Sequence, residues 1–515
     1  AGIWMNTQRP EWNDANNALV GYGVSVTTLY YLRKHLEFCY QIFDNADIQE
    51  ASISEEVTEW FESILQTFQN YKELLQDSIS DKNRKAILDE LEIAAEKKKK
   101  KIYSNGFSGQ NKNLSNNQIL NFFNIALKYI DHTIEANQRE DDLYEAYNLI
   151  NLNDSDKISI RHLYEMLEGQ VAVLSSDYLS IQDSLDVLKA LRNSSLYRKD
   201  QNSYILYPDR KLPRFLGKNN IPKEDFQKSK LLQTMIEKDD RRIVTSDSKG
   251  NFHFNGNLHN NKYLKEVLDN IEQSELKELA DKEKDLLMNI YEKNFDHQSF
   301  TGRSGTFYKY EGLGCIYWHM VSKLLLAVGD LFYRAKDEGA GSNILDEIKN
   351  KYYEIRRGIG VTKSPEEYGA FPTDPYSHTP SYIGAQQPGL TGQVKEDFIS
   401  RFNELGVIVE DGKISFCLDL LRDTEFLSHS SEFRYFDMEG NEQLLQLEKG
   451  SLAFTLAQVP VIYHKAKENK ITITNEGEQS NSLKGNQLDK SISRAIFMRS
   501  GEISRIDVYF DSDRF

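Results

Sequence analysis

The sequence is poor in cysteine and in long apolar runs, and it has no excess of basic residues. Its three cysteines, Cys39, Cys315 and Cys417, are too few and too scattered for a disulfide framework or a zinc site. No stretch approaches about 18 consecutive apolar residues, so no membrane span is predicted. Basic residues number 63 against 79 acidic ones. The net charge of −16 argues against a nucleic-acid partner, because phosphate backbones attract basic surfaces.

Helical periodicity is present over most of the chain. From Asn16 to about Ser364 apolar residues recur at helical spacing, and Ser52 with Glu55 has the spacing of a capping box. Residues 198–260 break this pattern with two short strand candidates, 204–206 and 252–254. The predicted helices cover roughly 16–36, 57–68, 81–101, 115–137, 158–176, 180–192, 262–293, 312–337, 344–357 and 391–405.

Proline is scarce but concentrated, and a change of pattern follows it. Five of the ten prolines fall between Pro365 and Pro388, which predicts a long loop without helix. From Gly406 onward the apolar residues alternate with period two, which is typical of strands. The strand candidates are 414–416, 433–435, 452–454, 461–463, 471–473, 495–497 and 506–509. We therefore expect a mainly α region over 1–405 and a β-sandwich over 406–515.

The first chemical motif stands almost at the start of the chain. Arg9, Glu11, Trp12, Asn13 and Asp14 precede the first predicted helix. A tryptophan face can stack on a sugar ring, arginine and amide groups can bind hydroxyls, and a carboxyl group can protonate the leaving oxygen of a glycosidic bond. The alternative is that the Asn and Asp residues only cap the helix.

A second motif is the glycine-rich segment 302–314, which carries Arg303 and Glu311. It leads into a helix that bears Tyr317, Trp318 and His319. Arg303 and Glu311 suit substrate contacts or an ion-paired scaffold equally well, and His319 suits a structural hydrogen bond at least as well as a ligand role.

The third motif is the proline-rich loop together with the helix that follows it. Tyr376 and His378 lie in the loop, and Thr391, Gly392 and Gln393 open the helix. A Thr-Gly pair at a helix start can hold an anion, because free N–H groups converge there with the positive end of the helix dipole. An ordinary threonine N-cap is the alternative. No group has the spacing of a metal site.

Two of these motifs together resemble the cellobiose and chitobiose phosphorylase family, glycoside hydrolase family ninety-four. Trp12-Asn13-Asp14, with Glu11 before it and Asn16 behind, is similar to the Asp-Trp-Asn-Asp motif of that family. Leu390-Thr391-Gly392 and a helix, followed by Leu405-Gly406-Val407 and 411–414, resemble its junction between toroid and sandwich.

The resemblance implies a mainly α fold, an (α/α)6 toroid followed by a C-terminal β-sandwich, here with a helical insertion at about 41–290. It also implies inverting phosphorolysis of β-linked glucose oligosaccharides without a cofactor, with inorganic phosphate as co-substrate. Asp14 corresponds to the general acid, and Thr391 and Gly392 correspond to the phosphate-binding turn; we expect His378 and Arg303 to complete the anion site. The expected sugar contacts are Arg9, Glu11, Trp12, Asn13, Glu311, Trp318, Tyr376 and Gln393.

Departures from the family pattern leave other readings open. Glu11 stands where the family has aspartate, and the residues after Gly392 differ from those usual there. A hydrolase or transglycosidase that uses water or a sugar hydroxyl would need a second carboxylate, for which Glu311, Asp374 and Glu396 are candidates. A non-catalytic glycan-binding module is the third reading.

The early position of Asp14 also bears on the chain as a whole. In the related enzymes the general acid lies well inside the toroid, so we expect this chain to be the C-terminal portion of a longer polypeptide. Cysteine usage and the resemblance lead us to expect a cytoplasmic protein, and a homodimer is the default expectation for its oligomeric state.

Overall fold

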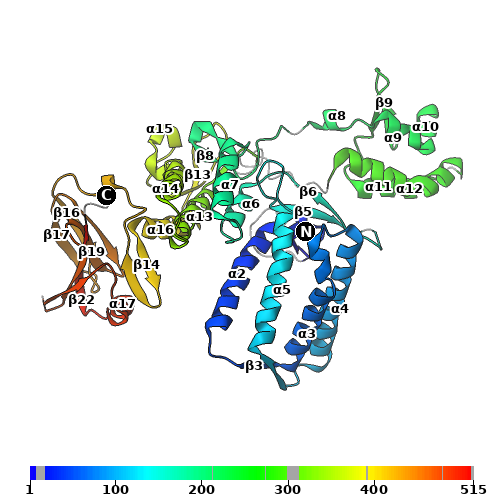
Figure 1. The fold of residues 1–515 in the computed structure, drawn as a ribbon. Coiled ribbons are helices and arrows are strands. Elements are labelled where there is room, and N and C mark those ends of the chain that lie inside the picture. Colours follow the sequence, from blue (N-terminus) through cyan, green and yellow to red (C-terminus); the bar gives the residue numbers. More distant parts are fainter. Residues whose placement is uncertain are drawn as a thin grey trace.

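The computed structural model describes residues 1–6, 18–152, 154–211, 213–272, 274–297, 313–389, 392–477 and 479–511. It is about 47% helical and 21% strand, and the strands form eight sheets. The expected mainly α toroid with a C-terminal β-sandwich is wrong. In the described part of the chain the helices fall into separate groups interrupted by small sheets, and they do not close into a barrel (Figure 1).

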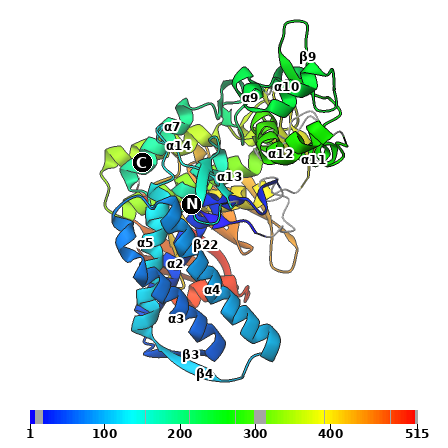
Figure 2. The ribbon, with the colours of Figure 1, turned by 90° about the vertical axis from the view of Figure 1, so that its right-hand side faces the viewer.

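Four long helices form a bundle that projects from the rest of the molecule (Figures 1 and 2). They are α2 (Val26–Asn45), α3 (Glu55–Asn70), α4 (Asp81–Asn105) and α5 (Asn116–Glu135), with the hairpin of β3 (Glu50–Ser54) and β4 (Asn111–Ser115) at the far end. The capping box predicted at Ser52 is wrong, because Ser52 pairs with Asn113 in this hairpin. A capping box does occur at Ser115 and Gln118, where α5 begins.

A four-stranded antiparallel sheet joins the bundle to the central helices. It has the order β1 (Ile3–Trp4), β2 (Gly23–Ser25), β5 (Tyr147–Asn151), β6 (Ser159–His162). This sheet corrects two predictions. The continuous helix expected over 16–36 is interrupted by β2, so that α2 begins only after the Ser25 cap. The helix expected over 158–176 is β6 followed by α6 (Leu167–Leu174).

The largest apolar core belongs to the central helices. The central helices are α6, α7 (Ile181–Asn193), α13 (Trp318–Asp337), α14 (Ser342–Arg356) and α16 (Gly392–Leu405). The core also takes buried residues from α2 and α5, whereas α16 packs against α13 and contributes none of its described residues to this core. Next to them run the hairpin β7 (Tyr197–Arg198), β8 (Ser203–Tyr204) and the sheet β11 (Ile316–Tyr317), β12 (Tyr376–Thr379), β13 (Gln386–Pro388). The proline-rich stretch contains a short helix after all, α15 (Pro365–Tyr368), because proline at the first helical position loses no hydrogen bond.

Residues 213–297, described except for position 273, form a module with its own apolar core, here called the insertion module. Its helices are α8 (Phe215–Lys218), α9 (Lys223–Lys228), α10 (Lys230–Glu237), α11 (Asn261–Asp269) and α12 (Ser274–Phe295). Strands β9 (Val244–Ser246) and β10 (Phe252–Phe254) form a hairpin, as predicted for 252–254. The single helix expected over 262–293 is instead two helices, because α11 ends at Asp269.

The C-terminal strands form two hairpins and a five-stranded sheet. The hairpins are β14 (Val407–Glu410) with β15 (Lys413–Phe416) and β16 (Ser431–Phe436) with β17 (Glu442–Leu447). The sheet has the order β18 (Ser451–Leu456), β19 (Val459–Ala466), β22 (Ile503–Asp511), β20 (Lys470–Asn475), β21 (Ser480–Lys484), and β19 lies parallel to β22. The strand predicted at 495–497 is wrong: Asp489 caps helix α17 (Lys490–Phe497) there.

Short 3-10 turns complete the description at Lys72–Gln76, Lys199–Gln201, Gly360–Thr362 and Asp423–Glu425. In the described part of the chain, no helix combines the length and apolarity that crossing a membrane requires.

Candidate functional site

Eight of the predicted site residues lie outside the described residues, and their roles stay predictions. They are Arg9, Glu11, Trp12, Asn13, Asp14, Arg303, Glu311 and Thr391. Described residues beside two of the motifs nevertheless meet in one place. Met5 and Leu19, on either side of the first motif, pack in one apolar cluster with Tyr207, Tyr164 and Leu313, which directly follows the second motif.

The backbone next to this cluster leads to the third motif. Leu206 N–H donates to the carbonyl of Cys315 at 3.1 Å, and the β11–β12 pairing sets Tyr317 opposite His378. Gly314 has a φ of +73°, and a Cβ there would lie 2.7 Å from Ser381 Oγ, so the approach of these segments requires glycine. The described parts of the three motif regions therefore adjoin one another.

A compact group of four residues, here called the histidine cluster, lies where β11 and β12 meet α13 and α16. It consists of Tyr317, His319, His378 and Glu396. The rings of Tyr317 and His378 stack with centroids 4.9 Å apart, and Tyr317 Oη lies 3.3 Å from His319 Nδ1. His319 Nε2 lies 3.1 Å from Glu396 Oε2. His378 and Glu396 are 6% and 3% exposed.

The burial of the cluster sets its electrostatics. Burial lowers the pKa of His319, and the neighbouring Glu396 carboxylate only partly opposes this shift. His319 is therefore mainly neutral near pH 7, so one ring nitrogen can donate and the other can accept. A buried carboxylate beside a neutral imidazole can fix its tautomer and can exchange a proton with it.

The starts of two helices adjoin the histidine cluster. Tyr317, the N-cap residue of α13, makes no side-chain hydrogen bond to the first turn of that helix. Helix α16 begins at Gly392, and Gln393 is buried in its first turn, where its side chain bonds to that of Asp397. Asp397 also accepts a hydrogen bond from Ser322 of α13 at 2.7 Å. Unpaired N–H groups at a helix start favour an anionic ligand.

Two predicted sugar contacts lie deeper in the structure. Trp318 is 0% exposed, and its indole N–H donates to Thr379 Oγ1 at 2.8 Å. The ring of Tyr368 lies between Trp318 and Tyr376, with centroid distances of 5.4 and 5.7 Å. Trp318 is thus a core residue in this structure, whereas Tyr376 is only partly buried. Their contact with substrate stays a prediction.

Two residues of this region are not among the predicted site residues. His319 suits, from the sequence, a structural hydrogen bond at least as well as a ligand role, and its position after the glycine-rich segment is the only signal for the latter. The guanidinium of Arg210 stacks 3.7 Å above the ring of Tyr164, beside the apolar cluster. Burial raises the pKa of Tyr164 to about 12, and the charge of Arg210 opposes this shift. No sequence pattern pointed to Arg210.

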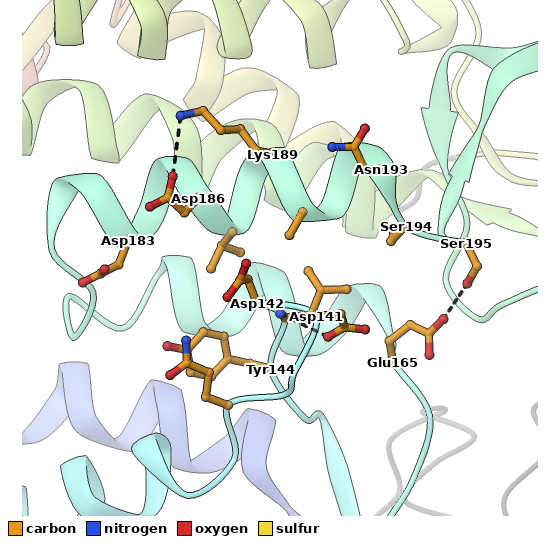
Figure 3. Close-up of a pocket in the computed structure, with 14 residues that line it drawn as sticks. Asp141, Asp142, Tyr144, Glu165, Asp183, Asp186, Lys189, Asn193, Ser194 and Ser195 are labelled. Atoms are coloured by element: carbon orange, nitrogen blue, oxygen red, sulfur yellow. Dashed lines mark hydrogen bonds and ion pairs between the residues drawn. The ribbon is translucent and has the colours of Figure 1, made fainter.

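A separate acidic pocket of about 530 Å³ lies against α7 (Figure 3). Its carboxylates are Asp141, Asp142, Glu165, Asp183 and Asp186. Asp186 faces Lys189 at 3.5 Å, and Glu165 accepts a hydrogen bond from Ser195. None of the predicted site residues that the structure describes lines this pocket. Within the same described residues, no group of three or more His, Cys, Asp or Glu side chains is arranged to hold a metal ion.

Comparison with known protein families gives a match over part of the chain. A family model described as GH149 phosphorylase insertion domain 2 matches residues 212–298, about a sixth of the chain, which coincide with the insertion module. No curated protein matches the sequence. This match supports a glycoside phosphorylase family and therefore an enzyme. It does not point to the cellobiose and chitobiose phosphorylase family in particular.

Proposed function

We propose that the protein is an inverting glycoside phosphorylase that acts on β-linked glucose oligosaccharides. The observation that carries this proposal is the match of the insertion module to a phosphorylase insertion domain. The adjoining motif regions support it, because the histidine cluster and two helix starts supply neutral donors and backbone N–H groups for an anion. In a chain of net charge −16, a dianionic substrate needs such local donors.

In the proposed reaction, Asp14 donates its proton to the glycosidic oxygen while an oxygen of inorganic phosphate attacks the anomeric carbon from the opposite face. The bond between the anomeric carbon and the leaving oxygen breaks, and a new carbon–oxygen bond to phosphate forms. The products are a sugar 1-phosphate of inverted configuration and a saccharide shortened by one unit. Phosphate would lie at Thr391 and Gly392, with His378, Arg303 and the newly found His319 as donors.

The test is to incubate the protein with β-linked glucose oligosaccharides, with and without phosphate, and to measure sugar 1-phosphate. We expect product only with phosphate, and near-complete loss in Asp14→Asn. The exposed carboxylate of Asp374 provides the matched control, and Asp374→Asn should retain activity. Absence of sugar 1-phosphate from the unmodified protein in the presence of phosphate would contradict the proposal.

One observation favours a hydrolase or transglycosidase as the second candidate. Of the three carboxylates considered as a base, Glu396 is buried and lies 3.1 Å from His319. Reducing sugar that forms equally fast without phosphate, and that is lost in Glu396→Gln, would establish this alternative. The third reading is a non-catalytic glycan-binding module. It predicts that no product forms under any condition and that Asp14→Asn leaves glycan binding unchanged.

A further inference from the structure

A second cavity lies far from the histidine cluster, where α13 and α14 face the C-terminal strands. This junction cavity has a volume of about 330 Å³, and its walls include Lys336, Lys349, Arg422, Asn469 and Phe510. The volume is at the lower end for small-molecule sites. Lys336 stands 17 residues after His319 on α13, which corresponds to about 25 Å along the helix. The cavity is therefore separate from the candidate active site.

Three of the six charged side chains that line the junction cavity, Lys336, Asp419 and Asp423, are in ion pairs. Lys336 Nζ lies 2.6 Å from Asp419 Oδ2 and also donates to the sulfur of Cys417. Asp423 forms an ion pair with Lys465. These contacts account for one of the three cations that line the cavity and for two of its three carboxylates; the third carboxylate, Asp511, has an interaction elsewhere.

The other two cations form no ion pair with a carboxylate of the residues that the structure describes. Lys349 Nζ donates to the backbone carbonyls of Asp419 at 2.7 Å and Leu421 at 3.0 Å. The guanidinium of Arg422 lies 3.5 Å above the ring of Tyr353 and donates no hydrogen bond to any residue that the structure describes. Burial lowers the pKa of Lys349; Asp419 opposes the shift, whereas the nearby Arg422 charge adds to it. Lys349 and Arg422 line the same cavity, and the Arg422 guanidinium donates no hydrogen bond to a described residue, so an anion is the ligand that this pair of cations favours.

We propose that the junction cavity binds a phosphate group, carried by inorganic phosphate or by a sugar phosphate. Arg422 supplies the planar fork that binds two phosphate oxygens at once, and Lys349 supplies a second positive charge. The amide of Asn469 accepts from Asp511 N–H through Oδ1, and its Nδ2 remains for a ligand oxygen. Phe510 forms an apolar wall. The cavity has room for more than a bare phosphate ion, which suits a sugar phosphate.

Isothermal titration of the full chain with glucose 1-phosphate, inorganic phosphate and glucose tests the proposal. We expect Arg422→Gln to remove one binding site, or to weaken it at least tenfold, for whichever phosphate compound binds there. Arg434→Gln is the control, because Arg434 is exposed on β16 and its substitution changes the net charge by the same amount. Glucose alone should show no difference among the three proteins.

Further variants separate this proposal from the function of the histidine cluster. Lys349→Gln keeps a donor for the two carbonyls but removes the charge, so it should weaken the same site even if Arg422→Gln lowers the melting temperature. His319→Gln should leave the site intact. If the protein has no phosphorylase activity, the unmodified chain should still show the site that Arg422→Gln removes. Equal stoichiometry and affinity in the unmodified protein, Arg422→Gln and Lys349→Gln would overturn the proposal.

Discussion

The insertion module and the central helices each contain a histidine paired with a carboxylate, but the two pairs differ in their surroundings. In the module, His253 Nε2 lies 3.4 Å from Asp247 Oδ2 in the β9–β10 hairpin. Asp247 also accepts backbone hydrogen bonds from Lys249 and Asn251, and the bonds from Asn251 hold its pKa below the ordinary value. The Asp247 carboxylate already accepts hydrogen bonds within its own turn, so we interpret the His253–Asp247 pair as structural.

The central pair lies between two helix starts instead. Glu396 is almost fully buried, and its partner His319 is kept neutral by burial. The family match falls on the module, whereas the groups that can bind an anion or move a proton lie in the central region. The segment that matches a family model is therefore not the segment in which the candidate site lies, and the predictions that follow test this division.

The largest expected effect is on catalysis. His319→Gln should lower kcat/KM for phosphorolysis by about 100-fold or more, because it removes the partly buried imidazole, which can transfer a proton, from the proposed anion site. His253→Gln is the matched substitution in the module and should change kcat/KM by no more than about twofold. Steady-state assays of the two variants decide the point. A similar loss in both, with unchanged melting temperatures, would show that the module takes part in the chemistry.

The sequence predicted most elements of the central region and lost accuracy where tertiary contacts override local pattern. Helices α7 and α16 were predicted within one residue of each end because their apolar spacing is regular. Strand β2 was missed because Val24 also fits the helical stripe, and its pairing with Asn148 lies far away in sequence. The strand predicted at 495–497 failed for the opposite reason: the Asp489 cap starts a helix that period-two matching overlooks.

The site was predictable only in part. His378 and Gln393 were predicted from the sequence, because proline and a helix start mark the segments that carry them. The stacking of Tyr317 on His378 and the approach of Glu396 to His319 depend on how β11, α13 and α16 meet, which no local spacing encodes. Arg422 and Lys349 are ordinary surface residues in the sequence, and only the fold brings them to one cavity.

The second prediction concerns the separate core of the module. Leu264 is fully buried there, and Leu264→Ala should destabilise the module by about 3 kcal/mol through the cavity it leaves. Since this core shares none of its buried residues with the central one, hydrogen exchange should speed up in α11 and α12 but not in α13. Leu324→Ala, in the central core, is the control with the opposite pattern. Faster exchange in both regions from either change would mean that the two cores unfold together.

The third prediction uses two buried carboxylates. Glu145 is 5% exposed, and burial raises its pKa to about 7, although Arg139 opposes this. The folded state therefore favours the protonated carboxyl. The stabilisation that comes from protonated Glu145 is fully present below about pH 4.5 and is lost as the pH rises through about 7. Glu145→Gln should match the unmodified protein at pH 4 and exceed its stability by about 2 kcal/mol at pH 8.

Asp225 in the module provides the control for this prediction. It is equally buried, but Lys228 and Lys293 each donate to it at 2.7 Å and lower its pKa. Its stabilisation is present above the ordinary carboxyl pKa and is lost as the pH falls, so Asp225→Asn should destabilise the protein at pH 8. Denaturation at several pH values measures both. A pH-independent effect of Glu145→Gln would show that its carboxyl is ionised throughout.

The smallest expected effect concerns how two helices begin. Asn260 caps α11 in the module by accepting from Lys262 N–H and Tyr263 N–H, so Asn260→Ala should cost about 1 kcal/mol. Helix α13 has no side-chain cap at Tyr317, so Tyr317→Phe should leave the stability of that helix unchanged while it weakens phosphate binding through His319. Urea denaturation and phosphate titration of both variants compare a helix start used for stability with one open to a ligand. If Tyr317→Phe and Asn260→Ala lowered the free energy of unfolding equally, the Tyr317 hydroxyl would stabilise the start of α13 although it makes no capping hydrogen bond.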